Sequence, residues 1–435
     1  MQNVNRIDES SQVIKVIGGG LAGVEAAWKI ARAGLPVTLY EMKPRRFSPA
    51  HESENLAELV CSNSLKAERV GSAAGLLKAE MAALGSLCVA VAQQCRVPAG
   101  GALAVDRDEF SRKITQAIEA EPLITLLREE VTQIPERGTV IIAAGPLASD
   151  DLATDIQQKF GAGLHFYDAA APIVTAESVD MNHAFAQSRY DRGGVDDYLN
   201  CPMNREEYQD FLAALRTAQR AHTHAFDVYE GCMPIEVLAG RGDDTMRFGP
   251  LKPVGLRDPR TGHRPWAVLQ LRRENAAGTM LNLVGCQTNL KFGEQRRVFG
   301  MIPALRNAEF CRFGVMHRNT FIDSPRILGQ DFQVKSWSGL YFAGQITGVE
   351  GYMESAASGL LAGINAARSS PLLLPPETML GALSRYISDE TVTNFQPMGA
   401  NFGLLPPLDM RIRDKKERYE KLAERAFSSL RCVLG

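Results

Sequence analysis

The stretch Val13-Ile14-Lys15-Val16-Ile17-Gly18-Gly19-Gly20-Leu21-Ala22-Gly23-Val24-Glu25-Ala26-Ala27 decides the fold. An apolar run, which predicts a strand, ends in three glycines, and alanine-rich helical sequence follows. A second apolar run then ends at Glu41. Glycines with this spacing let the backbone turn tightly, approach a pyrophosphate and bring helix and strand together. The pattern therefore predicts a strand, turn, helix and strand that bind a dinucleotide; the alternative is a tight glycine turn with no ligand.

The start of the predicted helix and the end of the second strand supply different contacts to such a ligand. The helix N-terminus offers free N–H groups and the positive end of its dipole to phosphates. Glu41 stands where an acid bonds ribose hydroxyls. The predicted cofactor contacts in this region are Gly18, Gly19, Gly20, Leu21, Ala22, Gly23 and Glu41.

A second glycine-spaced segment comes late in the chain. The run 339–344 predicts a strand, 345–354 a glycine-spaced loop, and 355–363 the start of a helix of small residues. A second helix N-terminus close to the first suits a flavin better than a nicotinamide. Two further segments resemble cofactor-lining elements: the Cys61-Ser62-Asn63-Ser64 turn and the strand that ends at Gly145. The contacts predicted from these segments are Ser62, Asn63, Ser64, Gly145, Gly344, Gln345, Gly348, Glu350, Gly351 and Ser355.

These two halves of a cofactor site are separated by a mixed, glycine-rich block over residues 200–315. We therefore predict an α/β protein, in which a Rossmann-type FAD-binding domain is split in sequence around an inserted α+β domain. The expected bounds are a flexible leader over 1–12, the FAD-binding domain over 13–195 and 319–435, and the insertion over 196–318; a helix ends the chain. Periodicity predicts one amphipathic helix over 73–94, another helix over 206–222, and strands near 248–254, 266–271 and 280–284.

Composition is that of an ordinary globular protein, with 435 residues, 45% hydrophobic and 23% charged. No apolar run reaches the ~18 residues that span a membrane, and the first twelve residues lack a signal-peptide core, so we expect a cytoplasmic protein without a membrane partner. The eight cysteines form no C-x-x-C pair, so we expect no metal site. The sequence predicts that most of them, Cys88, Cys95, Cys201, Cys286, Cys311 and Cys432, are reduced packing residues.

Charge is distributed unevenly along the chain. Residues 241–335 contain 16 Lys and Arg against 8 Asp and Glu, a balance of +8, whereas the whole chain has a net charge of −2. This balance favours a surface that faces a polyanion, although a solvated basic face is the simpler interpretation.

Several motifs, in this order, resemble the bacterial folate- and FAD-dependent tRNA (uracil-5-)-methyltransferases, the TrmFO family. They are Gly18 to Gly23, Glu58 to Ser64, Val97 to Arg107, Glu230-Gly231-Cys232-Met233-Pro234-Ile235-Glu236, Gly314 to Phe321 and Ala343 to Asn365. The resemblance runs from about Val13 to about Arg425. The tRNA wobble-uridine modification flavoproteins, the MnmG family, are related but carry a long helical extension beyond the length of this chain.

The resemblance implies that 5,10-methylenetetrahydrofolate donates a one-carbon unit through reduced FAD to C5 of the T-loop uridine at tRNA position 54. NADH or NADPH supplies the reducing equivalents, and the absence of a second G-x-G-x-x-G fits a nicotinamide that binds transiently. The partners implied are the tRNA T arm and folate, not DNA; the oligomeric state is not implied.

The implied chemistry needs a cysteine thiolate, since uracil C5 becomes nucleophilic only when a nucleophile adds at C6. The resemblance assigns this role to Cys232, with Cys61 as the second candidate. The base that removes the C5 proton is left open among the other cysteine, Glu350 and Glu354. Because the uracil is stacked in its loop, it has to be flipped out. The basic residues expected to hold the RNA backbone are Arg257, Arg260, Arg264, Arg272, Arg273, Lys291, Arg296, Arg297, Lys415 and Lys416.

Three other functions stay open at this stage. The same chemistry on a 23S rRNA uridine would use the same motifs. A generic FAD oxidoreductase acting on a small molecule would need neither RNA nor Cys232, and a non-catalytic FAD-containing RNA-binding protein would keep the basic surface alone. Stacking of Phe292 or Trp266 on a pterin or a base is also open, with core packing as the simpler expectation.

Overall fold

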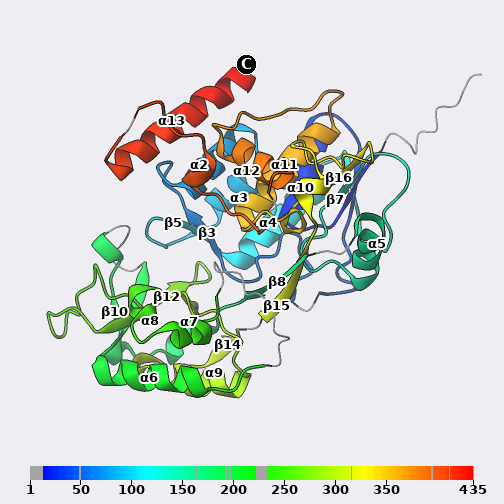
Figure 1. Ribbon diagram of the computed structural model, residues 1–435. Helices are drawn as coiled ribbons and strands as arrows, with labels where there is room; N and C mark the ends of the chain where they lie inside the picture. Colours follow the sequence, from blue (N-terminus) through cyan, green and yellow to red (C-terminus); the bar gives the residue numbers. More distant parts are fainter. Residues whose placement is uncertain are drawn as a thin grey trace, which may run out of the picture.

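A computed structural model describes most of the chain. The described residues are 13–48, 50–161, 164–191, 194, 197–221, 233–314, 316–392, 395–410 and 412–434, with the side chains of 164–169, 191 and 316–320 excluded. The predicted leader over residues 1–12 lies outside them. Two domains are visible, each with its own hydrophobic core, and a two-stranded ribbon connects them (Figure 1).

The first domain is built on a five-stranded parallel sheet. Its spatial order is β16 (Leu340–Phe342), β7 (Val140–Ile142), β1 (Ile14–Ile17), β2 (Val37–Tyr40) and β6 (Ile124–Leu127). Strand β16 comes from the C-terminal part of the chain and pairs in parallel with β7, so the two sequence halves share one sheet. This arrangement confirms the predicted α/β fold class with a split Rossmann-type domain.

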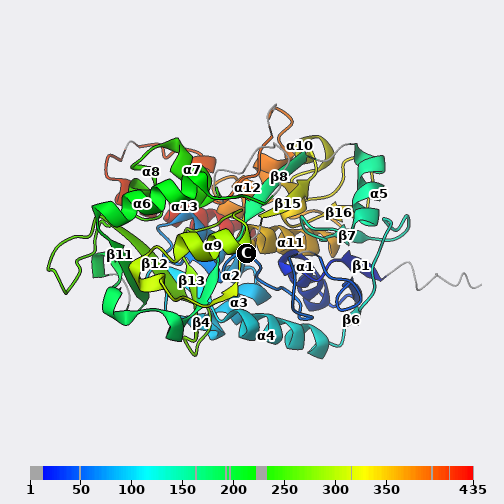
Figure 2. The ribbon, with the colours of Figure 1, turned by 90° about the horizontal axis from the view of Figure 1, so that it is seen from below.

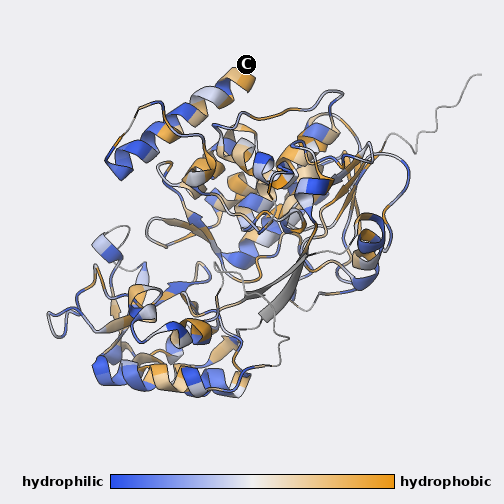
Figure 3. Ribbon diagram, viewed as in Figure 1, coloured by the Kyte–Doolittle hydropathy of each residue, from blue (hydrophilic) through white to orange (hydrophobic). Residues whose placement is uncertain are grey.

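Helices and a small antiparallel sheet complete this domain. The helices are α1 (Leu21–Arg32), α2 (Ala73–Ala83), α3 (Leu87–Gln94), α4 (Arg107–Ala120), α5 (Asp150–Phe160), α10 (Ser324–Ile327), α11 (Tyr352–Ala366), α12 (Met379–Ser388) and α13 (Lys415–Leu434). The small sheet has the order β3 (Ser64–Ala67), β5 (Ala102–Val105), β4 (Arg96–Val97). Helix α13 lies along the outside of the domain and carries both hydrophilic and hydrophobic residues (Figure 3).

The predicted helix over residues 73–94 is two helices. Helices α2 and α3 meet at an angle of 110°. The break follows from Gly85, which has φ +74°, and from Ser86, whose side chain caps α3 by accepting from the Val89 N–H. In the part of the chain that the structure describes, no single helix has the length and apolarity to cross a membrane, and only the bent pair α2–α3 together meets those two criteria.

The second domain is an antiparallel sheet flanked by helices. The sheet order is β10 (Phe185–Ala186), β11 (Tyr198–Met203), β12 (Ala267–Arg273), β13 (Met280–Leu283), β9 (Ile173–Thr175) and β14 (Phe310–Arg312). Its helices are α6 (Arg205–Thr217), α7 (Ile235–Arg241), α8 (Thr245–Phe248) and α9 (Phe292–Phe299). Strands β8 (Leu164–Ala169) and β15 (Met316–Phe321) form the connecting ribbon.

Two expectations for this domain differ from the structure. Strands β9 and β10 precede residue 196, the expected start of the insertion, yet they belong to its sheet. We therefore propose residues 164–321 as the inserted unit with its ribbon. No strand forms over residues 248–254, all of which are described: α8 ends at Phe248 and turns follow. Gly249 and Pro250 interrupt the apolar run there, because proline lacks a ladder donor.

Candidate functional site

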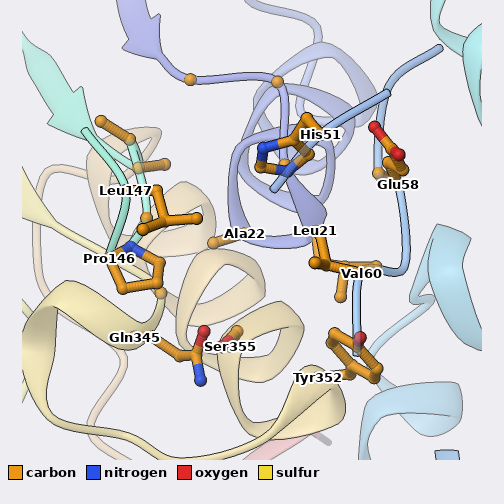
Figure 4. Close-up of a pocket in the computed structure, with 18 of the residues that line it drawn as sticks. Leu21, Ala22, His51, Glu58, Val60, Pro146, Leu147, Gln345, Tyr352 and Ser355 are labelled. Carbon is orange, nitrogen blue, oxygen red and sulfur yellow. The ribbon is translucent and has the colours of Figure 1, made fainter. Parts of the chain in front are cut away.

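The main pocket lies where the central parallel strands end. Strands β1, β2 and β7 pair with Ile17 opposite both Tyr40 and Ile142, so the glycine turn, Glu41 and Ala143 reach the same edge of the sheet. The C-terminal edge of a doubly wound sheet is the usual position for a nucleotide. Figure 4 shows labelled lining residues from α1, from the loop after β7 and from the start of α11 around one space.

The glycine turn leaves the first N–H groups of α1 without a side-chain cap. Gly20 is the N-cap residue and forms no side-chain hydrogen bond. A Cβ on Gly20 would meet nothing within 4 Å, whereas a Cβ on Gly18 would lie 2.5 Å from the Ala143 carbonyl oxygen and one on Gly23 would lie 1.7 Å from the Gly18 carbonyl oxygen. Gly18 and Gly23 are therefore required by the packing of strand and helix, and Gly20 faces the pocket. An uncapped helix start beside open space is a cradle that suits a phosphate.

Glu41 is held in place at the end of β2. Its Oε2 accepts a hydrogen bond from the Gly19 N–H at 2.8 Å, and its Oε1 accepts one from the Lys43 N–H at 2.9 Å. The carboxylate is buried and lines the pocket. Because each carboxylate oxygen accepts more than one hydrogen bond, Glu41 retains capacity for the hydroxyls of a ribose.

A second uncapped helix start faces the first. Helix α11 begins after Gly351, which has φ +120° and forms no side-chain cap hydrogen bond. Helices α1 and α11 pack at close range, since a Cβ on Gly359 would lie 2.0 Å from the Ala22 carbonyl oxygen and one on Gly363 would lie 2.6 Å from that of Ala26. The small residues of α11 thus bring both helix N-termini to one pocket.

Most of the predicted contact residues line this pocket. They are Gly18, Gly19, Gly20, Leu21, Ala22, Glu41, Cys61, Ser62, Ser64, Gly145, Gly344, Gln345, Glu350, Gly351 and Ser355. Gly23, Asn63 and Gly348 do not belong to the lining. Gly23 is buried between β1 and α1, and a Cβ on Gly348 would lie 2.5 Å from the Phe395 ring.

Asn63 has a different set of partners. Its side-chain amide donates to the carbonyl oxygens of Val105 and Arg273, and its Oδ1 accepts from the Arg272 Nε at 3.1 Å. Arg272 also donates to the Ser62 Oγ at 3.0 Å. The polar turn after Cys61 therefore joins the two domains as well as lining the pocket. Arg272 is buried in this contact and is not available to RNA, contrary to the expectation from its charge.

A buried ion pair strengthens the same domain contact. Arg107, at the start of α4, donates to the Glu274 Oε2 at 2.8 Å and to the Val60 carbonyl oxygen at 3.0 Å. Burial is the largest single influence and lowers the pKa of Arg107, but Glu274, Tyr352 and Cys61 together outweigh it, so the pKa is raised. The pair fixes the backbone next to Cys61 relative to the inserted domain.

Cys61 contacts a tyrosine that sequence reasoning missed. Its Sγ lies 3.0 Å from the Oη of Tyr352, and that oxygen accepts the backbone N–H of Cys61 at 2.7 Å and of Ser62 at 3.3 Å. With two N–H groups donating to the oxygen, the phenol O–H is the donor toward the sulfur. Burial raises the pKa of Tyr352 well above its usual value, so this proton stays on the oxygen at neutral pH.

Several charged residues of the lining were not predicted. Lys43 Nζ donates to the Ser53 and Asn55 carbonyl oxygens and lies 3.4 Å from the Glu58 Oε2. Next to it, burial and the charge of Lys43 lower the pKa of His51, which is therefore neutral at pH 7. No sequence pattern marks these residues, because they reach the pocket through the irregular loop after β2.

Glu354, one of the predicted candidates for the base, also lies in the pocket lining. Its Oε1 accepts from the Lys66 Nζ at 2.8 Å and from the Ala400 N–H at 3.0 Å. Its Oε2 is buried and has no hydrogen-bond partner among the described atoms. A buried carboxylate oxygen with unused acceptor capacity in the pocket wall is suited to accept a proton.

Cys232 lies outside the described residues, but the two ends of its segment are described. The Ala221 N–H donates to the Asn289 carbonyl oxygen at 2.8 Å, and the Ile235 N–H donates to that of Gln287 at 2.7 Å. Gln287 itself lines the pocket. The described residues on the two sides of this segment are therefore bonded to neighbouring positions of the inserted domain, and Gln287 connects the C-terminal side to the pocket lining.

The remaining cysteines and basic residues separate by burial. Cys88, Cys95, Cys201 and Cys286 are buried, as predicted, and burial raises the pKa of Cys201 to about 12; Cys311 and Cys432 are exposed, so their predicted packing role is wrong. Among the basic residues, Arg260 pairs with Asp258 and Arg297 with Glu294, both at 2.6 Å. The exposed side chains of the predicted basic set without an ion pair to the described acids are Arg257, Arg264, Lys291, Arg296 and Lys415.

The fold and the pocket define a Rossmann-type protein of the class typical of FAD binding, with an inserted α+β domain. The sequence profile described as "Glucose inhibited division protein A" matches residues 13–371. The solved structure of Aquifex aeolicus GidA superposes with a TM-score of 0.70 at 17% identity, over 97% of this chain and 73% of that chain.

Curated relatives are more similar over nearly the full length. Methylenetetrahydrofolate--tRNA-(uracil-5-)-methyltransferase TrmFO of Moorella thermoacetica is 59% identical, over 96% of this chain and 97% of the relative. TrmFO of Desulfitobacterium hafniense is 57% identical over 96% and 97%, and TrmFO of Enterococcus faecalis is 57% identical over 95% and 97%. The chain belongs to the glucose inhibited division protein A family and, within it, to the TrmFO family.

Proposed function

We propose that the protein transfers a one-carbon unit from 5,10-methylenetetrahydrofolate to C5 of a uracil in the T arm of tRNA, with FAD bound in the main pocket and NAD(P)H as reductant. The observation that carries the proposal is a nucleophile candidate, Cys61, in the wall of a pocket that also contains two uncapped helix starts. The names of the curated relatives support the same donor and acceptor.

The residues of the pocket fit FAD. The N–H groups after Gly20 and Gly351 would hold the pyrophosphate and the flavin end, and Glu41 would accept from the ribose of the adenosine. Bound FAD would supply a redox ring that links the reducing equivalents of NAD(P)H to the folate-derived carbon. The protein would bind and orient this group and keep water from it.

A cysteine thiolate starts the proposed chemistry on the uracil. The sulfur forms a bond to C6, and the electron pair of the C5–C6 double bond moves onto the C4 oxygen as an enolate, which makes C5 nucleophilic. Once C5 carries the new carbon, a base removes the C5 proton and the S–C6 bond breaks. One hydride, derived from NAD(P)H, reduces the new carbon to a methyl group, and the bonds from that carbon to the folate nitrogens are replaced by N–H bonds. Donor, uracil, NAD(P)H and one proton thus give 5-methyluracil, tetrahydrofolate and NAD(P)⁺.

One cysteine and one carboxylate of the described residues have positions that suit these roles. Cys232 remains our first choice for the nucleophile, from the family motif, and Cys61 is positioned by the hydrogen bond to Tyr352. The second cysteine, Glu350 and Glu354 are the candidates for the base, and all three stay open; the buried Oε2 of Glu354 has no described hydrogen-bond partner. Lys66 and the Ala400 N–H fix the other oxygen of that carboxylate.

Nucleoside analysis of RNA from cells that lack the protein tests the acceptor. We expect 5-methyluridine to disappear from bulk tRNA while 23S rRNA stays unchanged, and to return when the wild-type protein is expressed. Loss from rRNA with tRNA unchanged would move the same chemistry to rRNA. No change in either RNA would favour a flavin oxidoreductase that acts on a small molecule.

A further inference from the structure

Phe292 is the outer member of a stack of aromatic rings on the inserted domain. Although core packing was the simpler expectation, its side chain at the start of α9 is 52% exposed. Its ring stacks on Phe313, with centroids 4.6 Å apart and planes inclined by 16°. Phe313 also stacks on Phe310, at 5.4 Å and 4°, and the Arg296 guanidinium carbon lies 4.7 Å from the centre of the Phe313 ring.

The stack is anchored to the domain rather than mobile at its base. Phe310 packs against the core of the inserted domain, at 6.5 Å from Phe299. The buried Gln295 connects α9 to the segment of Phe313, since its Nε2 donates to the Gly314 carbonyl oxygen at 2.7 Å and its Oε1 accepts from the Gly314 N–H at 2.8 Å. An exposed aromatic ring on a rigid base presents contact area at little entropic cost.

The position of the stack is next to the pocket. The Thr288 N–H donates to the carbonyl oxygen of Ala170, and both Ala170 and Gln287 line the pocket. Gly314, which follows Phe313, is close to the same atom, because a Cβ on Gly314 would lie 2.6 Å from the Ala170 carbonyl oxygen. Both segments that carry the stacked rings are therefore in contact with Ala170 of the pocket lining at one end, and Figures 1 and 2 show that α9 lies nearer to the connecting ribbon β8–β15 than α6 does.

The surroundings of Phe292 are cationic. Lys291 and Arg296 are exposed without a described acidic partner, whereas Glu294 is paired with Arg297. The Lys291 N–H also donates to the carbonyl oxygen of Gln219 at 3.0 Å. Aromatic faces with guanidinium groups bind unstacked bases, and the adjacent cations attract the phosphates.

We propose that Phe292, Phe313 and Arg296 form a stacking platform that receives an unpaired base of the substrate RNA, next to the flipped uracil. This inference rests on the proposed function. When a uracil leaves the stack of its loop, the neighbouring base loses a stacking partner. The exposed ring of Phe292 replaces that partner, while Arg296 supports the stack and faces the backbone.

The test uses the FAD-loaded protein and a synthetic T-arm stem-loop RNA, in which 2-aminopurine replaces the loop base beside the target uridine. We expect Phe292→Ala to weaken RNA binding, measured by anisotropy, and to raise KM for RNA by about 5- to 30-fold. The flavin absorption spectrum, kcat at saturating RNA and KM for the folate donor should stay close to wild type. Phe292→Trp should restore affinity, and the change in 2-aminopurine fluorescence on binding should be lost in Phe292→Ala only.

Phe248→Ala is the matched control, because Phe248 is 80% exposed on the same domain but belongs to α8. Equal loss of RNA affinity in Phe248→Ala would overturn the platform, as would RNA affinity of Phe292→Ala within twofold of wild type. A rise in the folate KM alone would assign the ring to the pterin and also overturn it. If the wild-type protein binds the RNA but transfers no carbon, the proposed function is refuted and the binding data alone decide on the platform. If the wild-type protein does not bind the RNA, both proposals are refuted.

Discussion

The glycine turn after β1 separates two kinds of glycine, and substitution should separate their effects. Gly20 has φ −74° and ψ −174°, a conformation that alanine adopts freely, and a Cβ there meets no protein atom within 4 Å. Gly23→Ala would instead place a Cβ 1.7 Å from the Gly18 carbonyl oxygen, a backbone atom that cannot rotate away. Gly20→Ala should therefore spare the protein without FAD and impair FAD binding, while Gly23→Ala should destabilise the domain itself.

The size of each effect follows from the contacts involved. In Gly20→Ala the methyl group occupies the space in front of the α1 N-terminus, and loss of one or two hydrogen bonds from N–H groups to a charged phosphate costs about 1.5–3 kcal/mol each. That loss raises the Kd for FAD by at least about tenfold. In Gly23→Ala the separation of β1 and α1 costs about 1–3 kcal/mol or more of folding free energy.

The assay compares thermal unfolding of both variants after removal of FAD, and then titrates FAD by quenching of its fluorescence. Gly20→Ala should unfold at the temperature of the wild-type protein without FAD and gain less stability when FAD is added. Gly23→Ala should unfold at a lower temperature without FAD. Wild-type affinity for FAD in Gly20→Ala would refute the assignment of this helix start to the phosphates, and equal destabilisation of both variants would refute the separation of roles.

Three further predictions concern the surroundings of the pocket. Arg107→Met should lower the free energy of unfolding in urea by about 3–5 kcal/mol, because it leaves the Glu274 carboxylate buried and unpaired. The double variant Arg107→Met/Glu274→Met should recover most of that loss; a double variant no more stable than Arg107→Met would contradict this. Tyr352→Phe should slow alkylation of Cys61 by iodoacetamide about tenfold at pH 7, because the thiolate loses a hydrogen bond. Mass spectrometry measures the rate, with the exposed Cys432 as internal reference, and an unchanged rate would exclude the phenol as donor. Burial raises the pKa of Glu80 to about 7 from 4.5, so the stability that its protonation contributes is present below pH 4.5 and lost as the pH rises through 7. Relative to Glu80→Gln, the free energy of unfolding of the wild-type protein should fall by up to about 3 kcal/mol between pH 5 and 8. A relative rise would show that the Met379 and Leu380 N–H groups outweigh burial.

Local pattern was sufficient for the first domain. Strand β1, the glycine turn and α1 follow from an apolar run and glycine spacing within one short segment, and Glu41 is one residue beyond β2. The late partner segment was found because Gly344, Gly348 and Gly351 carry positive φ angles that the sequence marks with glycine. Each of these signals is local.

The residues that sequence did not reveal depend on contacts between distant segments. Asn63 looked like a lining residue because it stands among small polar residues, but its partners Arg272 and Arg273 lie in the other domain. Tyr352 was unmarked, since its contact with Cys61 joins residues 291 positions apart. Phe292 is a large apolar residue, for which core packing was the simpler expectation, and only the fold shows that α9 begins at the surface.

One reaction tests the central claim most directly. Purified protein with FAD, NADPH, a tRNA transcript and 5,10-methylenetetrahydrofolate labelled in its one-carbon unit should transfer the label to C5 of a T-loop uracil, in an amount that depends on NADPH. A transcript that lacks the target uridine should stay unlabelled. Label that reaches the tRNA from S-adenosylmethionine, or no transfer from the folate donor to tRNA, would contradict the account.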